Sequence, residues 1–235
     1  MTTSIHWDFS TGTREGLGSA CGGYVLEPMG EGVRMVRDEE LGRTVPEFSG
    51  GGWLEIPRAR LGALDIHGPG AQVTVEARVK ILEPALYQAI AGVWDETRCK
   101  RQYCLFYNLN ARYDSKENLH GHISHIGGPT PGHDFCVTYA TGASRLPVGT
   151  WMTLSMQYDG RDIRVFVDGA LDQNPRADPF RPGESVLNPY HYPGAIFDGG
   201  PDGAPFTVGA VHRSGEMGNW FIGRLAALRV ANGAG

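Results

Sequence analysis

The chain has 235 residues, of which 41% are hydrophobic and 10% aromatic, a content that excludes a disordered chain. Its 34 glycines and 15 prolines argue against a helical bundle and indicate a globular protein with many turns. The net charge is −5 without a long basic run, and no stretch reaches the roughly 18 apolar residues of a membrane helix, so we expect neither nucleic acid nor a membrane as partner.

Alternation of apolar and polar side chains predicts strand after strand along the chain, and only 58–64 resembles a short helix. The alternation is clearest in 72–81 and in 151–158, and Asp159-Gly160 is a strong hairpin signal. In chain order, we expect strands at 4–9, 33–37, 53–56, 72–81, 87–94, 102–109, 119–126, 134–139, 151–158, 162–167, 206–211 and 221–230.

About a dozen strands with tight turns predict an all-β fold, namely two stacked antiparallel sheets in a jelly-roll sandwich with little helix. No linker or internal repeat divides the sequence, so we expect one domain over residues 1–235. Two loops are long or stiff for such a fold, 174–205 with seven prolines and 127–132. Long ordered loops on a rigid sandwich often carry binding groups.

The N-terminus has neither a basic segment nor an apolar segment typical of a secretory signal. We therefore expect a cytoplasmic protein, with secretion open if the sequence is a trimmed form. The cysteines have no zinc-type spacing and are expected to be free, mostly buried thiols. They are Cys21, Cys99, Cys104 and Cys136.

Several segments resemble laminin-G-like domains of the concanavalin A-like lectin/glucanase superfamily. They are 48–57 (FSGGGWLEIP), 73–80 (VTVEARVK), 146–169 with its W…YDG…VDG spacing, 206–209 (FTVG) and 221–225 (FIGRL). They are spread between residues 48 and 225 of the chain. The resemblance implies the jelly-roll fold and does not by itself assign an activity.

The sequence departs from the family pattern at two places. Arg78 stands where the family usually has tryptophan, and Ser49 with Gly51–Gly52 replaces the acidic residues of the opening turn. Calcium binding is frequent among relatives, and these replacements argue against it here. We expect no cofactor and no metal ligand, with calcium on Asp198 and Asp202 as the alternative.

Three imidazoles lie within six residues at 120–125. At strand spacing His120 and His122 share one face, and His125 points to the other. Histidine titrates near neutral pH, so His120 and His122 are candidate proton-transfer groups. The alternative is a polar strand whose imidazoles only hydrogen-bond to neighbouring strands.

The segment 101–108 combines amide, aromatic and basic side chains. Alternation places Gln102 and Asn108 on one face and Arg101 and Tyr107 on the other. Amides and aromatic rings suit sugar recognition, a phenol beside an imidazole suits β-elimination, and arginine can neutralise a uronate. We therefore expect Tyr107 to be catalytic, and Arg101, Gln102 and Asn108 to bind substrate. The alternative for the aromatic residues is the core.

Four further groups are candidates for binding substrate, each against a purely structural alternative. The turn 212–220 is dense in polar side chains and can clamp a ligand or be a solvated turn. Tyr190 and His191 can form a lid, and Trp94 can contribute a ring. The candidates in full are Trp94, Tyr190, His191, His212, Arg213, Glu216 and Trp220.

We expect a carbohydrate ligand, and a carbohydrate-active enzyme as the first hypothesis, either a glycoside hydrolase or a polysaccharide lyase. The alternatives are a non-catalytic lectin-like module and a protein-interaction module of the laminin-G type. All of the sugar hypotheses require that the imidazoles of 120–125 and the late turn 212–220 converge on one side of the molecule.

Overall fold

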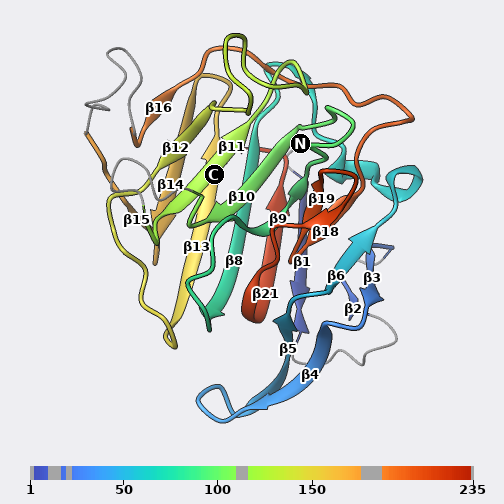
Figure 1. Ribbon diagram of the computed structural model, residues 1–235, viewed down its shortest axis with the longest axis vertical. Helices are drawn as coiled ribbons and strands as arrows, with labels where there is room; N and C mark the ends of the chain where they lie inside the picture. Colours follow the sequence, from blue (N-terminus) through green and yellow to red (C-terminus); the bar gives the residue numbers. More distant parts are fainter. Residues whose placement is uncertain (1–2, 10–16, 20–22, 110–115, 176–186, 234–235) are drawn as a thin grey trace.

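The computed structural model describes residues 3–9, 17–19, 23–109, 116–175 and 187–233 (Figure 1). Two large antiparallel sheets stack face to face and enclose the main hydrophobic core. The all-β sandwich expected from the alternation is confirmed. The helix in the described residues is of the 3-10 type and includes η2 (Arg58–Arg60) and η3 (Gly62–Leu64). No helix among these residues is long and apolar enough to cross a membrane.

The first sheet has nine strands, and its centre is the pair of longest strands. The order is β15-β14-β13-β8-β21-β5-β4, with β1 added beside β21 and β16 beside β14. Their bounds are β15 (Ala170–Leu171), β14 (Asp162–Val167), β13 (Trp151–Tyr158), β8 (Val73–Ile81), β21 (Ile222–Ala231), β5 (Arg43–Ser49), β4 (Val33–Asp38), β1 (Ser4–Asp8) and β16 (Tyr190–His191).

The second sheet has eight strands in the order β12-β11-β10-β9-β18-β6-β3-β2 and faces the viewer in Figure 1. Their bounds are β12 (Tyr139–Thr141), β11 (Leu119–Ile123), β10 (Tyr103–Tyr107), β9 (Gln88–Val93), β18 (Phe206–Val208), β6 (Gly52–Ile56), β3 (Val25–Gly30) and β2 (Leu17–Gly18). Two small pairs lie outside these sheets, β7 (Gly68–Pro69) with β17 (Ala195–Ile196), and β19 (Val211–Arg213) with β20 (Glu216–Gly218).

Alternation along β8 and β10 assigns side chains to the two faces of each sheet. The apolar side chains of β8 are fully buried in the core between the sheets. From β10, Tyr103, Leu105 and Tyr107 enter the same core, whereas Cys104 and Phe106 belong to a separate cluster on the outer face. The pairing of β10 with β11 places His122 and His120 on the same outer face, because Cys104 lies opposite His122 and Phe106 lies opposite His120.

Some expected elements differ from the observed ones. Segment 58–64 forms the two 3-10 turns, and 134–138 is a loop that reaches strand geometry only at Tyr139. The sequence pattern also missed β3 and β5, each of which contains a proline that breaks the apolar alternation. The long loop 174–205 contributes β16 and β17, and its part 176–186 lies outside the described residues.

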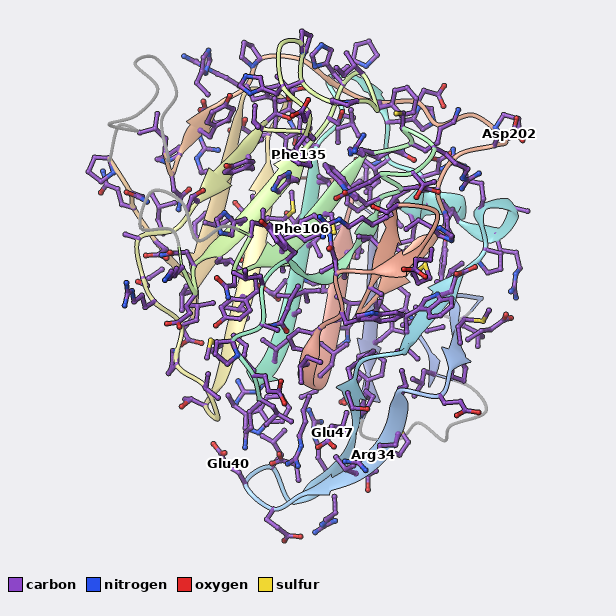
Figure 2. The ribbon with its side chains drawn as sticks, in the orientation of Figure 1. Arg34, Glu40, Glu47, Phe106, Phe135 and Asp202 are labelled. Atoms are coloured by element: carbon purple, nitrogen blue, oxygen red, sulfur yellow. The ribbon has the colours of Figure 1, made fainter. Side chains whose placement is uncertain are left out.

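A buried ionic network joins the β4–β5 hairpin to the outer face of the nine-stranded sheet. The Asp38 carboxylate is 1% exposed and accepts hydrogen bonds from Arg224 Nη1 at 2.8 Å and Trp151 Nε1 at 3.2 Å. Glu47 accepts from Arg224 Nε at 2.8 Å and from Arg34 Nη2 at 2.6 Å. Figure 2 shows Arg34 and Glu47 at the end of the molecule distant from Phe135.

Candidate functional site

An aromatic cluster around His122 occupies the outer face of the eight-stranded sheet. The imidazole stacks on Tyr139, with ring centroids 4.6 Å apart and planes at 29°. It meets Trp94 edge-on at 5.3 Å and Phe106 edge-on at 5.1 Å. Phe106 is labelled near the centre of Figure 2. The four rings come from strands β10, β11 and β12 and from the residue that follows β9. Strand pairing therefore brings together side chains that are spread over positions 94–139 of the sequence.

His120 lies on the same face, one side-chain row along the sheet. Its Nδ1 is 3.1 Å from Thr141 Oγ1, and its ring contacts Tyr139 edge-on at 5.7 Å. His120 is 1% exposed. The structure thus holds His120 in the sheet through a threonine and a ring contact, while His122 occupies the middle of the cluster.

The His122 imidazole is buried and neutral. Both ring nitrogens are buried, and neither has a hydrogen-bond partner among the described residues. Burial is the main reason why the pKa of His122 lies well below its usual value, and the nearby His120 and Arg101 lower it further. A neutral imidazole offers one donor and one acceptor, and neither function of His122 is used within the described residues.

Arg101 lies beside this imidazole, two residues before the start of β10. Its Nη1 donates to the Gly127 carbonyl at 3.1 Å, and its guanidinium carbon lies 5.9 Å from the Trp94 ring centroid. Nε is buried and has no partner among the described residues. The expectation that Arg101 shares a face with Tyr107 is wrong, because Arg101 precedes the regular strand and strand alternation does not extend to it.

Trp94 and its neighbour Glu96 connect this cluster to the β19–β20 hairpin. Trp94 Nε1 donates to Glu96 Oε1 at 3.3 Å, and the other Glu96 oxygen is 4.0 Å from Arg213 Nε. The backbone N–H of Glu96 donates to the His212 carbonyl at 2.8 Å. Val211 packs in the same apolar cluster as Trp94 and Phe106. The structure therefore brings the middle of the chain and the late turn 212–219 to one side of the sheet.

The loop between β11 and β12 borders the cluster. Cys136 is buried in it with Trp94 and Phe106, and the preceding residue, Phe135, is 63% exposed. Figure 2 shows Phe135 beyond Phe106 toward the end of the molecule that carries this loop. A large exposed ring beside a buried aromatic cluster is an unusual surface feature.

Other predicted site residues lie elsewhere. Tyr107 points into the core between the sheets, and burial raises its pKa to about 12, so the structure does not place this phenol with the imidazoles. Gln102 donates to Asp65 Oδ1 at 3.2 Å and accepts from Arg58 Nη1 at 3.0 Å. Asn108 donates to the Pro84 carbonyl at 2.8 Å and accepts from the Glu117 N–H at 2.8 Å. Both amides therefore hold loops together.

The remaining candidates lie in three different places. Tyr190 and His191 form β16 at the edge of the nine-stranded sheet, where His191 Nδ1 lies 2.9 Å from Asp162 Oδ1. Trp220 lies beside Trp53 of β6, with ring centroids 6.2 Å apart. Glu216 is exposed and pairs in register with Arg213 in the hairpin. No hydrogen bond, ion pair or ring contact of the described part of the chain joins His191 or Trp220 directly to His122.

Cysteine and acidic residues form no metal-binding arrangement in the part of the chain that the structure describes, since no group of three or more His, Cys, Asp or Glu has suitable geometry. Asp198 accepts from the Gly200 N–H at 2.9 Å, and Asp202 is labelled at the margin of Figure 2. Cys99, Cys104 and Cys136 are free, and Cys99 is exposed; Cys21 lies outside the described residues.

The sequence analysis does not identify Tyr139 or Phe135 as members of the site. It also does not identify Glu96 as the contact between Trp94 and the β19–β20 hairpin. Tyr139 stands at the end of the expected strand 134–139, and its register with His122 identifies it as a neighbour once β11 and β12 pair. The contacts of Glu96 depend on the position of β19, which no local pattern encodes.

Neither protein-family models nor curated proteins give a match to this sequence. Solved structures, in contrast, do match this chain. Domain 4 of AbnA, a GH43 extracellular arabinanase from Geobacillus stearothermophilus, in complex with arabinotriose, is 14% identical with a TM-score of 0.61, over 98% of this chain and 92% of that one. Trypanosoma rangeli sialidase is 13% identical with a TM-score of 0.56, over 97% of this chain and 30% of that one.

A third solved structure is the CBM40 of Ruminococcus gnavus IT-sialidase bound to α2,3-sialyllactose. It is 14% identical with a TM-score of 0.50, over 73% of this chain and 78% of that one. This chain therefore spans about a third of the T. rangeli sialidase and most of the two smaller domains. Identities this low show the fold, a β-sandwich shared by these proteins, and leave function to the residues of the site.

Proposed function

We propose that the protein binds carbohydrate on the outer face of the eight-stranded sheet, at the aromatic cluster of Trp94, Phe106, His122 and Tyr139. The observation that supports this proposal best is the group of rings around an imidazole with two unused hydrogen-bonding nitrogens. Aromatic rings contact the apolar face of a sugar, and isolated donors and acceptors bind its hydroxyl groups.

The borders of the cluster support the same proposal. Glu96 and Arg213 place a carboxylate and a guanidinium beside Trp94, and both are partly exposed. Sugar hydroxyls commonly need such charged groups as hydrogen-bond partners. Two of the structural neighbours are described with a bound oligosaccharide, arabinotriose and sialyllactose, which agrees with this proposal for a chain of the same fold. We also propose that this chain belongs to the laminin-G-like group.

The experiment is a binding titration of the protein against a panel of plant, microbial and animal oligosaccharides. Arg213→Ala, at the border of the cluster, is expected to weaken binding about tenfold by removing a charged hydrogen bond. Arg229→Ala is the matched control, because Arg229 is a partly exposed arginine that pairs with Glu76 on the other sheet. Equal binding by both variants, or no binding to any sugar, would refute the proposal.

A second candidate function is proton transfer to or from a bound sugar by His122. It is favoured by one specific observation, a neutral imidazole with no hydrogen-bond partner for either nitrogen among the described residues, which is the state that a general base requires. The test is incubation with the same panel. New reducing ends would indicate a hydrolase, and an unsaturated product absorbing in the ultraviolet would indicate a lyase. Intact sugars that remain bound would leave a lectin-like module.

A further inference from the structure

Arg101 is a buried cation without an anionic partner among the described residues. The residue is 4% exposed, and its guanidinium makes one hydrogen bond within the described residues, from Nη1 to the neutral carbonyl of Gly127. No carboxylate of these residues lies within ion-pair distance. Buried charges in proteins are nearly always paired, because an unpaired charge away from water is costly.

The other groups around Arg101 do not supply the missing negative charge. Trp94 offers only the face of its ring, and the His122 imidazole is neutral. The thiols of Cys104 and Cys136 are neutral too, because burial raises the pKa of each, and that of Cys136 stays raised although Arg101 favours its thiolate. Glu96 binds the indole N–H of Trp94 and approaches Arg213 instead.

The free part of the guanidinium has a defined shape. Because Nη1 is used by Gly127, Nε and Nη2 remain on the other edge, and Nε is buried without a partner among the described residues. Two parallel N–H groups of this kind match the two oxygens of a carboxylate. His122 lies next to Arg101 with a free donor and a free acceptor, as a carboxylate flanked by a hydroxyl requires.

We infer that the sugar bound at this face is acidic and that Arg101 binds its carboxylate through the Nε–Nη2 edge, with His122 hydrogen-bonded to the same sugar. This inference rests on the proposed carbohydrate function and names its substrate class, a uronic or other carboxylated sugar. The ligand carboxylate supplies the negative charge that the cluster lacks, and the rings of Trp94 and Phe106 shield the ion pair from water.

The test compares acidic sugars with neutral counterparts of the same shape by isothermal titration at low salt. Three pairs serve: oligogalacturonate and its methyl ester, α2,3-sialyllactose and lactose, and glucuronoxylan oligosaccharide and unsubstituted xylo-oligosaccharide. In at least one pair the acidic member is expected to bind at least about tenfold tighter, because a charge-assisted bond to a buried guanidinium is lost in the neutral one.

Variants assign the preference to one residue. Arg101→Gln is expected to abolish it, whereas Arg161→Gln, which removes an exposed charge from the β13–β14 turn, leaves it unchanged. Arg101→Gln is also expected to melt no lower than the wild type, since it removes an unpaired buried charge. If Arg101→Gln fails to fold, Arg101→Lys is the second variant. It keeps the charge but lacks the paired Nε and Nη2 donors, and it is expected to lose most of the preference for the acidic sugar.

Each remaining outcome overturns a different statement. Equal binding of the acidic and neutral members overturns the inference and leaves the proposed function standing. An acidic preference that survives in Arg101→Gln overturns the assignment to Arg101. Binding of neither member of any pair contradicts the proposed function itself, and the inference with it.

Discussion

The imidazole of His122 stacks on the phenol ring of Tyr139, with ring centroids 4.6 Å apart. The two residues are 17 positions apart in the chain and lie opposite each other in the β11–β12 pair. This stack removes His122 from water and leaves it without a hydrogen-bond partner in the described part of the chain. The same arrangement puts His122 at the centre of the proposed binding site and makes it a source of pH-dependent stability.

His122 is expected to make the fold less stable in mild acid. Its pKa in the fold lies well below the ordinary value of about 6.5, so below that pH the unfolded chain binds a proton that the folded chain does not. The free energy of unfolding should therefore decrease as the pH falls from 7 to 5, by up to about 1.4 kcal/mol per pH unit. Urea unfolding of wild type and His122→Phe measures this; an equally steep decline in the variant would contradict the assignment.

Asp38 is expected to be the most important charge for stability. Its pKa is held far below its usual range, since hydrogen bonds from Arg224, Leu41 and Trp151 and the charge of Lys80 outweigh its burial. Asp38→Asn breaks a buried pair and should cost about 3–5 kcal/mol of unfolding free energy.

In acid, the free energy of unfolding of Asp38→Asn should also depend less on pH than that of the wild type. The contribution of Asp38 is present above its unfolded pKa of about 3.9 and is lost as the pH falls through its folded value. Glu40→Gln is the control, because Glu40 is 58% exposed and pairs with Lys80 at the surface, where a loss of at most about 1 kcal/mol is expected. Similar losses in the two variants, measured by chemical unfolding, would contradict this account.

Gly121, between the two imidazoles, is expected to tolerate no side chain. A Cβ at this position would lie 2.8 Å from Met156 Cβ and 3.0 Å from Val165 Cγ1, both in the facing sheet. Gly121→Ala should therefore lower the unfolding free energy by about 1–3 kcal/mol through overpacking. In Gly128→Ala the new Cβ would lie at an ordinary distance of 4.0 Å from Cys99 Cβ, so little change is expected. Thermal melts of both variants provide the comparison.

Most of the fold could be predicted from the sequence, because strands such as β8 and β13 alternate with almost no interruption. The alternation also placed His120 and His122 on one face, as the register confirms. Strands β3 and β5 escaped prediction since prolines interrupt their apolar pattern.

The site was harder to predict, because its members are related by strand pairing and not by spacing along the chain. Tyr107 is predicted to act with the imidazoles because a phenol beside an imidazole suits β-elimination, yet β10 turns it into the core while Phe106 takes the outer face. Strand alternation predicts Arg101 on the face of Tyr107, but the regular strand begins only at Tyr103. Glu96 and Arg213 meet only because β19 follows β18 around the sheet.

Phe135 is expected to contribute to sugar binding without contributing to stability. Its ring is 63% exposed at the border of the cluster, so Phe135→Ala should change the unfolding free energy by less than about 0.5 kcal/mol. The loss of a stacking ring should weaken oligosaccharide binding severalfold. Leu171→Ala, an exposed apolar residue at the edge of the other sheet, is the control and should bind normally. Unchanged affinity in Phe135→Ala would show that this loop does not border the ligand.

The proposal that sugar binds at the His122 cluster is tested most directly by hydrogen–deuterium exchange with and without a saturating oligosaccharide. We expect slower exchange in 94–96, 119–124, 135–139 and 211–213, the segments that carry or border the cluster, and no change in β4, β5 or β21. Protection confined to the nine-stranded sheet, or to the edge formed by β16, would contradict it.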